Sequence, residues 1–263
     1  MDFMKLKNIK CFMLDMDGTF YLGDHLLPGA LDFMEYLARK NLDYLFLTNN
    51  SSKNRGIYTK KIRRLGFNVD ETRIFTSGEA TTIYLGKHTK FKRIYLLGTE
   101  DLENEFRQAA FELVKEKPNA VVLGFDTTLT YEKIWKACDF IRDGLPYIAT
   151  HPDFNCPTDS GFMPDIGSFI ALIEASTGRK PDVIIGKPYH HIVDAVIEKT
   201  GYQLNEIAMV GDRLYTDIAL GKAGIATILV LSGETKLVDL KKSEFQPDIV
   251  AKDLKDLLKQ LEK

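Results

Sequence analysis

The chain has 263 residues, 44% of them hydrophobic, and a formal net charge of −2. This length is enough for one large domain or two modest ones, and interspersed charges of both signs argue against nucleic acid or a membrane surface as a partner. The three cysteines show no CxxC spacing, which argues against a disulfide framework or a zinc site. The start of the chain lacks the apolar centre of a signal peptide, and no apolar run is long enough to cross a bilayer, so we expect a soluble, cytoplasmic protein.

Short apolar runs alternate along the chain with amphipathic segments of helical length. The runs predict strands at 11–14, 44–47, 93–97, 120–123, 147–149, 183–185, 207–210 and 228–231. The segments predict helices that begin at Pro28 and that cover about 54–65, 130–142, 168–177 and 191–200, with stops at Gly66, Gly178 and Gly201. This alternation is typical of an α/β fold with a mainly parallel sheet, in which ligands bind at the carboxyl ends of the strands.

One dense basic cluster lies on the predicted helix 54–65. It consists of Lys60, Lys61, Arg63 and Arg64. Because the same helix has regularly spaced apolar positions, we interpret the cluster as a solvated helix face rather than a patch for nucleic acid.

Residues 82–180 contain predicted strands and helices of their own. This segment separates the predicted strands before residue 82 from those after residue 180, which would otherwise form one α/β domain. We therefore predict that 1–81 and 181–263 form one discontinuous domain, which includes the run at 183–185. The segment 82–180 is predicted to form a second α/β module inserted into it.

Two aspartates follow the first predicted strand directly, as Asp15-Met16-Asp17. On an extended chain residues i and i+2 face the same way, so both carboxylates can point into one site while Met16 packs behind them. Two carboxylates this close repel each other unless a cation lies between them or one is protonated. The pair therefore suits a hard cation such as Mg²⁺, or a division of work between nucleophile and general acid; the alternative is a capped turn with solvated acids.

Polar groups also follow three other predicted strands. Thr48-Asn49-Asn50 offers a hydroxyl and backbone N–H groups ahead of a helix, which suits phosphate oxygens but also an ordinary helix cap. Lys187 offers a positive charge for a phosphoryl group, although most lysines are simply solvated. Asp212 and Asp217 can complete a metal site, or can be an N-cap and an exposed acid. Together these groups are the components that phosphoryl transfer requires.

In this order the motifs resemble those of the haloacid dehalogenase (HAD) superfamily, specifically its NagD-like, 4-nitrophenylphosphatase-type branch. Asp15 through Thr19 resembles the first superfamily motif, Thr48 the second, Lys187 the third, and Asp212 with Asp217 the fourth. The resemblance implies a Rossmann-like, parallel-sheet HAD core with an α/β cap domain inserted downstream of the second motif. It also implies a Mg²⁺-dependent phosphatase of small phosphate monoesters that forms an aspartyl-phosphate. The implied substrates are 4-nitrophenyl phosphate in vitro, with sugar phosphates or nucleoside monophosphates as natural candidates.

The same resemblance implies a role for each site residue. Asp15 is the nucleophile, and Asp17 is the acid that protonates the leaving oxygen and then the base that activates water. The implied Mg²⁺ ligands are the Asp15 carboxylate, the Asp17 backbone carbonyl, Asp212 and Asp217. The implied phosphate ligands are Thr48, Asn49, Asn50 and Lys187.

The segment 150–157 resembles the cap loop that selects the substrate in this branch. The side chains of that loop that we expect to meet substrate are His151, Asn155 and Cys156. For His151, and for His25 in the short flap after the first motif, an exposed or core histidine remains the alternative. Asp165 stands where the branch usually has a small residue, which leaves the local cap geometry open.

Other functions within and beyond the superfamily stay open at this point. A phosphotransferase or phosphomutase of the same superfamily is one alternative, although a phosphomutase would usually carry its cap directly after the first motif, where this chain has only a flap and one helix. A dehalogenase would not need Asp17, and a catalytically silent, phosphate-binding regulator would be expected to lack one of the acids. The expected partner is a small phosphorylated substrate, without nucleic acid or membrane, and both a monomer and a cap-mediated homodimer are possible.

Overall fold

The computed structural model describes residues 5–158 and 161–262. Two compact units divide the chain. The first unit comprises the residues through Thr48, Tyr58–Phe75 and those from Lys187 onward; the second unit comprises Asn49–Ile57 and Thr76–Gly186. These bounds differ from the predicted 1–81, 82–180 and 181–263, whose functional division into core and cap stays a prediction.

The first unit is built on a six-stranded sheet. Its order is β15 (Ile249–Ala251), β14 (Ala226–Val230), β13 (Ile207–Gly211), β1 (Cys11–Leu14), β4 (Asp43–Thr48) and β5 (Ile74–Thr76). The neighbouring pairs from β15 to β4 are parallel. The apolar runs predicted as strands at 11–14, 44–47, 207–210 and 228–231 all lie in this sheet, and β1 is buried along its whole length.

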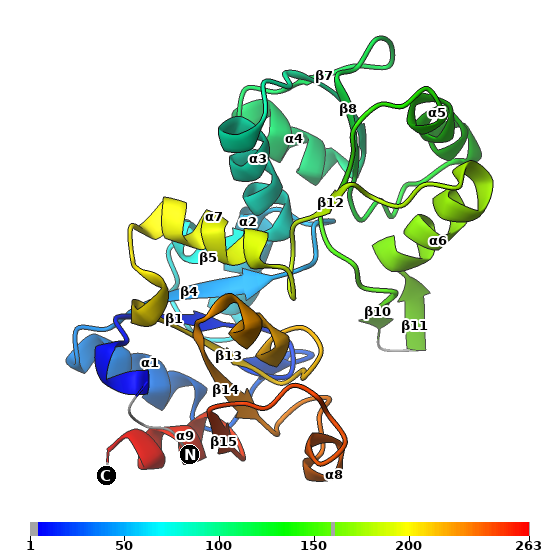
Figure 1. Ribbon diagram of the computed structural model, residues 1–263. Helices are drawn as coiled ribbons and strands as arrows, with labels where there is room; N and C mark the ends of the chain where they lie inside the picture. Colours follow the sequence, from blue (N-terminus) through cyan, green and yellow to red (C-terminus); the bar gives the residue numbers. More distant parts are fainter. Residues whose placement is uncertain (1–4, 159–160, 263) are drawn as a thin grey trace. The chain divides into compact units, whose positions relative to one another are not determined.

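Helices cover both faces of this sheet (Figure 1). α1 (Ala30–Arg39) and α9 (Leu254–Leu261) pack on one face, where Phe33, Leu37 and Leu257 join a continuous buried cluster. α7 (His190–Thr200) and the 3₁₀ helix η4 (Ile218–Ala223) contact each other and cover the other face. Two covered faces explain why the central strands are continuously apolar rather than alternating.

Shorter elements complete the first unit. They are η1 (Lys5–Asn8), the hairpin β2 (Tyr21–Leu22) and β3 (His25–Leu26), most of α2 (Arg55–Arg64), η2 (Glu71–Arg73), η3 (Leu204–Glu206) and α8 (Leu237–Leu240). In α2 the buried side chains are Tyr58, Thr59 and Ile62, so this helix has one packed face. Of the apolar positions on which the prediction rested, Ile62 is buried, Leu65 is half-buried and Ile57 is exposed.

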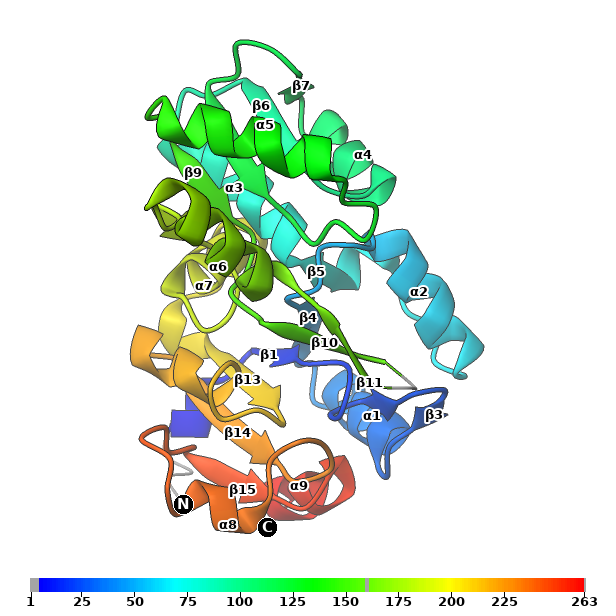
Figure 2. The ribbon, with the colours of Figure 1, turned by 90° about the vertical axis from the view of Figure 1, so that its right-hand side faces the viewer.

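The second unit is built on a five-stranded sheet, seen with its helices in Figures 1 and 2. Its order is β12 (Val183–Ile184), β9 (Tyr147–Ala149), β8 (Ala120–Leu123), β6 (Arg93–Leu97) and β7 (Glu112–Leu113), and the strands are parallel. α5 (Tyr131–Arg142) and α6 (Ile166–Thr177) pack on one face in a shared buried cluster; α3 (Ser77–His88) and α4 (Glu100–Gln108) lie on the other. A hairpin of β10 (Asn155–Thr158) and β11 (Gly161–Pro164) precedes α6.

The place of β12 corrects one expectation. We expected the run at 183–185 to be a strand of the domain that holds 181–263, but β12 pairs with β9 in the sheet of the second unit. Val183 and Ile184 are only half-buried, as suits a strand at the edge of a sheet. Lys187 therefore enters the first unit from a strand of the second sheet.

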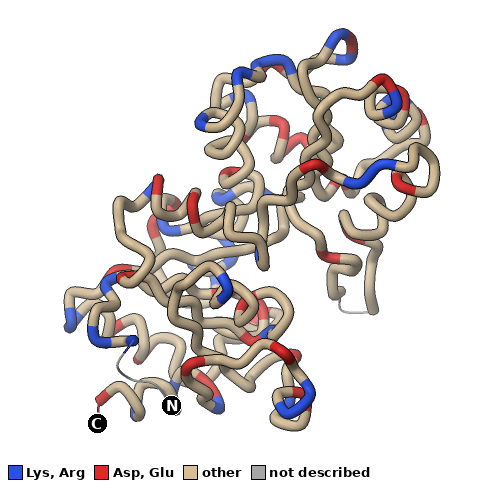
Figure 3. Tube along the Cα trace, viewed as in Figure 1, with Lys and Arg blue, Asp and Glu red and all other residues tan. Residues whose placement is uncertain are grey.

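Charges of both signs are interspersed along the described trace (Figure 3), as the composition indicated. Whether nucleic acid is absent from its partners stays a prediction. Among the described residues, no helix combines the length and apolar character that a membrane span needs.

Candidate active site

Asp15 stands at the carboxyl end of β1, which lies between β13 and β4. Its backbone N–H donates to the Val210 carbonyl at 2.9 Å, so the parallel ladder continues through the aspartate itself. The chain then turns sharply, because Gly18 N–H donates to the Tyr21 carbonyl at 2.8 Å. Met16 is buried in the core below this turn, as the alternation of side chains predicted.

Lys187 joins two of the predicted acids. Its Nζ donates to Asp15 Oδ1 at 2.6 Å and to Asp217 Oδ1 at 2.7 Å. Only 3% of Lys187 is exposed, and the Asp217 side chain has no exposed surface. A lysine this deeply buried needs paired carboxylates, so its charge belongs to the site rather than to the solvated surface.

Asp212 is held by the chain that follows β14. The Glu234 N–H donates to Asp212 Oδ2 at 2.6 Å, and the Ser232 hydroxyl donates to the Gly18 carbonyl at 2.8 Å. A Cβ at Gly233 would lie 2.0 Å from Asp212 Oδ2, and one at Gly18, where φ is +86°, would lie 2.6 Å from the same atom. Both glycines are thus required by the close approach of backbone to this carboxylate.

The carboxylates of Asp15, Asp212 and Asp217 form one group. One oxygen from each lies within 4.8 Å of the other two. Asp212 Oδ1 is buried and, among the described residues, has no hydrogen-bond partner. These hard oxygen donors, one of them unsatisfied, fit a divalent cation such as Mg²⁺ or Ca²⁺. The three residues would hold it through their carboxylates.

Electrostatics in this group also indicate a missing positive charge. Burial, followed by the charges of Asp15 and Asp217, raises the pKa of Asp212 to about 8. Burial raises the pKa of Asp15 as well, against the nearby charge of Lys187. Burial alone would lower the pKa of Lys187, but Asp15 and Asp217 outweigh it and raise the pKa. One ammonium thus does not offset three carboxylates, whereas a divalent ion would complete the balance.

Asp17 and Thr48 lie at the same edge of the first sheet. Asp17 is exposed, and the partial loss of solvent around it raises the pKa of its carboxyl group, against the lowering effects of Lys61 and Arg213. A raised pKa suits an acid that must carry a proton near neutral pH. Thr48 is the last residue of β4 and is buried, with 9% of its surface exposed.

Several groups at this edge had no role in our reading of the sequence. No role is predicted from the sequence for Ser232, Gly233 or Glu234. The Arg213 side chain pairs with Glu234 at 3.0 Å, and the Tyr215 hydroxyl donates to Glu234 at 2.8 Å. The sequence does contain a signal for this part of the site, because the polar residue Ser232 and then Gly233 follow directly after a predicted buried strand.

The other predicted contacts lie in the second unit, among residues of that unit. The Asn49 amide donates to both carboxylate oxygens of Asp153 at 3.2 Å, and the Asn50 amide donates to Cys156 Sγ at 3.8 Å. Asn155 is exposed at the start of β10. The roles of these side chains in binding phosphate or substrate stay predictions.

His151 is fully buried. Its Nε2 lies 3.0 Å from Asp165 Oδ1 and its Nδ1 lies 3.2 Å from the Thr150 hydroxyl. Asp165 also caps α6 by accepting the Ile166 N–H. This favours the core alternative for His151 over substrate contact, and it gives Asp165 a structural role. His25 lies exposed in β3.

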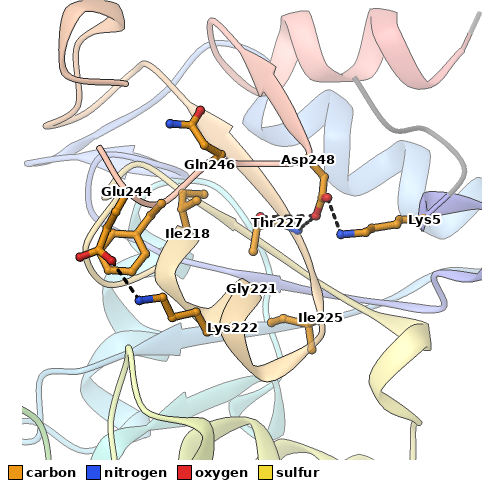
Figure 4. Close-up of a pocket in the computed structure, with 10 residues that line it drawn as sticks. Lys5, Ile218, Gly221, Lys222, Ile225, Thr227, Glu244, Gln246 and Asp248 are labelled. Carbon is orange, nitrogen blue, oxygen red and sulfur yellow. Dashed lines mark hydrogen bonds and ion pairs between the residues drawn. The ribbon is translucent and has the colours of Figure 1, made fainter. Parts of the chain in front are cut away.

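A cavity of about 310 Å³ elsewhere in the first unit contains none of these residues (Figure 4). Lys5 pairs with Asp248 across it at 2.7 Å, and Lys222 pairs with Glu244 at 3.2 Å. Because its charged side chains are already paired with one another, this cavity offers no arrangement for phosphate chemistry.

Comparison with known proteins agrees with this geometry. A family model described as haloacid dehalogenase-like hydrolase matches residues 12–112, and a second, HAD-hydrolase-like model matches residues 184–257. A protein named acid sugar phosphatase from Staphylococcus haemolyticus is 34% identical over 98% of this chain and 98% of its own length.

Two solved structures are similar along nearly the whole chain. The 4-nitrophenylphosphatase of Thermotoga maritima is 52% identical with a TM-score of 0.93, covering 97% of this chain and 98% of that one. The glycerol phosphate phosphatase of Mycobacterium tuberculosis, in complex with calcium, is 29% identical with a TM-score of 0.87, covering 96% of this chain and 76% of that one. The second structure shows that a relative with this fold binds a divalent cation.

Proposed function

Since the chain belongs to the haloacid dehalogenase-like hydrolases, in their 4-nitrophenylphosphatase-type branch, and is a phosphoric monoester hydrolase, we propose that it cleaves small phosphate monoesters with Mg²⁺ through an aspartyl-phosphate on Asp15. The observation that carries the proposal is the group of three carboxylates around Lys187, with one buried oxygen of Asp212 left without a partner. Such a group suits a dianionic phosphoryl unit only when a further positive charge is present.

Each residue has one task in the proposed reaction. A carboxylate oxygen of Asp15 attacks phosphorus, and the bond to the ester oxygen breaks while Asp17 donates a proton to that oxygen. Asp17, now ionised, accepts a proton from water, which attacks the phosphorus of the aspartyl-phosphate and releases inorganic phosphate and free Asp15. Lys187 orients Asp15 and neutralises charge, and the Thr48 hydroxyl donates to a phosphate oxygen.

Mg²⁺, when held by Asp15, Asp212 and Asp217, supplies positive charge that stabilises the transferring phosphoryl group. The Asp17 backbone carbonyl is proposed as a further ligand. We also propose that the segment 82–180 is the cap domain. Within this proposal, Asn49 and Asn50 help bind phosphate, and Asn155 and Cys156 belong to the loop that selects substrate.

The relatives indicate which esters to try. One is named a 4-nitrophenylphosphatase, one an acid sugar phosphatase and one a glycerol phosphate phosphatase. Purified protein with Mg²⁺ should hydrolyse 4-nitrophenyl phosphate, and EDTA should stop the reaction. The Asp15→Asn variant should lose at least about 10³-fold in kcat, since removal of a nucleophile leaves only the binding contribution.

The matched control is Asp32→Asn, because Asp32 is an exposed aspartate on α1 of the same unit. Its turnover should equal that of the unaltered protein. Asp17→Asn should slow esters with poor leaving groups more than 4-nitrophenyl phosphate, because 4-nitrophenolate leaves without a proton. Equal turnover by the Asp15→Asn protein would refute the mechanism, and binding of phosphate esters without turnover would favour a regulatory protein instead.

A further inference from the structure

A second group of potential metal ligands lies on α7 (yellow in Figure 1), apart from the catalytic carboxylates. It consists of His190, His191 and Asp194, and one ligand atom of each lies within 4.8 Å of the other two. His190 Nε2 lies 3.8 Å from Asp194 Oδ2, and the centres of the two imidazole rings are 4.0 Å apart. Because atoms that share a tetrahedral ion at about 2.1 Å lie about 3.4 Å from one another, small side-chain rotations would bring all three onto one ion.

The helix explains why these three side chains gather. Residues i and i+4 share one face of a helix, which places His190 beside Asp194, and His191 borders the same face. The other face of α7 is packed in the first unit through four buried side chains, those of Ile192, Val193, Ala195 and Val196. The ligands are therefore carried by a packed helix, so little order has to be gained when an ion binds.

Solvent reaches this group, in contrast to the catalytic carboxylates. The side chains of His190 and Asp194 are 62% and 53% exposed, and His191 is half-buried. Asp212 is only 2% exposed, and Asp217 has no exposed surface. A dissolved ion can therefore approach the group on α7 directly, and water can fill the coordination positions that the three side chains leave open.

The donor atoms decide which class of ion fits. Two imidazole nitrogens and one carboxylate oxygen suit Zn²⁺, Ni²⁺ and Cu²⁺, which accept nitrogen ligands readily. Mg²⁺ prefers oxygen donors, which is what the carboxylates of Asp15, Asp212 and Asp217 offer. The two groups therefore differ in the ions that they select, and Mg²⁺ should compete poorly for the group on α7.

We propose that His190, His191 and Asp194 form a binding site for a transition-metal ion such as Zn²⁺, Ni²⁺ or Cu²⁺, separate from the three catalytic carboxylates. The proposal goes beyond the phosphatase function and does not depend on it. An ion held there joins the first turn of α7 to the second, and it stabilises the folded chain increasingly as its concentration rises above Kd.

Calorimetric titration of the untagged protein with Ni²⁺ tests the proposal directly. Excess Mg²⁺ is present throughout to compete for the catalytic carboxylates. One equivalent of Ni²⁺ should bind to the unaltered protein, and His190→Gln and Asp194→Ala should each raise Kd at least about tenfold, since each removes a ligand. Circular dichroism should show an unchanged fold for both variants, because both side chains are exposed.

The matched control is His88→Gln. His88 is likewise an exposed histidine on a helix, at the end of α3. Its ring stacks on Tyr84 at 4.8 Å, and among the described residues it belongs to no group of three potential metal ligands. Its substitution should therefore leave the affinity for Ni²⁺ unchanged.

Electron paramagnetic resonance of one equivalent of bound Cu²⁺ identifies the donor atoms. Couplings to imidazole nitrogen should be present with the unaltered protein and lost in the double variant His190→Gln/His191→Gln. An ion bound by carboxylates alone would show no such coupling.

Absence of Ni²⁺ binding, or an affinity that His190→Gln leaves unchanged, would overturn the proposal. So would a Cu²⁺ signal without nitrogen couplings, because the ion would then lie on oxygen ligands elsewhere. Neither measurement uses turnover, so failure of the proposed phosphatase function would leave this inference to be decided by the same titrations.

Discussion

Replacement of Lys187 by methionine would remove the ammonium that contacts Asp15 and Asp217 while keeping a side chain of similar length. In the structure this ammonium donates at 2.6 and 2.7 Å, and only 3% of the residue is exposed. Loss of one partner from a buried ion pair typically costs about 3–5 kcal/mol, because the remaining charge is left buried and uncompensated. For a chain of this size that cost corresponds to a fall in Tm of roughly 6–20 °C.

The measurement is thermal unfolding at pH 8 in EDTA, followed by circular dichroism. The double variant Lys187→Met/Asp217→Asn should recover at least about 1 kcal/mol, because it also removes one of the carboxylates that the lysine compensates. Lys222→Met is the control, since Lys222 is 67% exposed in its pair with Glu244, and it should change stability by less than about 1 kcal/mol. A Lys187→Met protein as stable as the unaltered one under these conditions would refute the charge arrangement described above.

Two other predictions concern the metal site. Folding raises the pKa of Asp212 from 3.8 to about 8. The stabilising contribution of its protonated carboxyl group is therefore fully present below pH 3.8 and is lost as the pH rises toward 8. Because a divalent ion favours the ionised carboxylate, the increase in Tm on addition of Mg²⁺ should be larger at pH 8 than at pH 5; an equal increase would contradict this. Gly233→Ala should weaken Mg²⁺ binding by about tenfold or more in calorimetry, because the added Cβ would displace the Asp212 carboxylate. Gly86→Ala, at a helical glycine with open space around its Cβ position, should leave that affinity unchanged.

The strands of the first sheet were accessible from the sequence because burial on both faces leaves a continuous apolar run. β1 and β13 are such strands, and both were predicted within one or two residues. The pairing of β12 was not accessible, because an apolar run says which residues are buried but not which strand lies beside them. The short β5 and β15 were missed, since three residues are too few to show a period.

In the site, charged side chains could be identified from the sequence, whereas the backbone contacts that support them could not. The sequence singled out Asp15, Lys187 and Asp217, which the structure brings into direct contact, because charged residues at strand ends are conspicuous. The support of Asp212 by the N–H of Glu234 was not accessible, since every residue but proline carries that donor. The position of Lys61 over Tyr21 was also missed, because it depends on how α2 packs against the loop after β1.

The strand order of the first sheet also determines how the site responds to partial disorder. β1, which delivers Asp15, is hydrogen-bonded on both sides, by β13 and β4, whereas β15 and β5 form the two borders. Fraying that begins at either border reaches the nucleophile only after a neighbouring ladder has opened. We therefore expect activity to be lost on heating only when the pairing of the central strands β13, β1 and β4 is lost cooperatively. Mutations that loosen the edge strands β15 and β5 should have little effect on turnover.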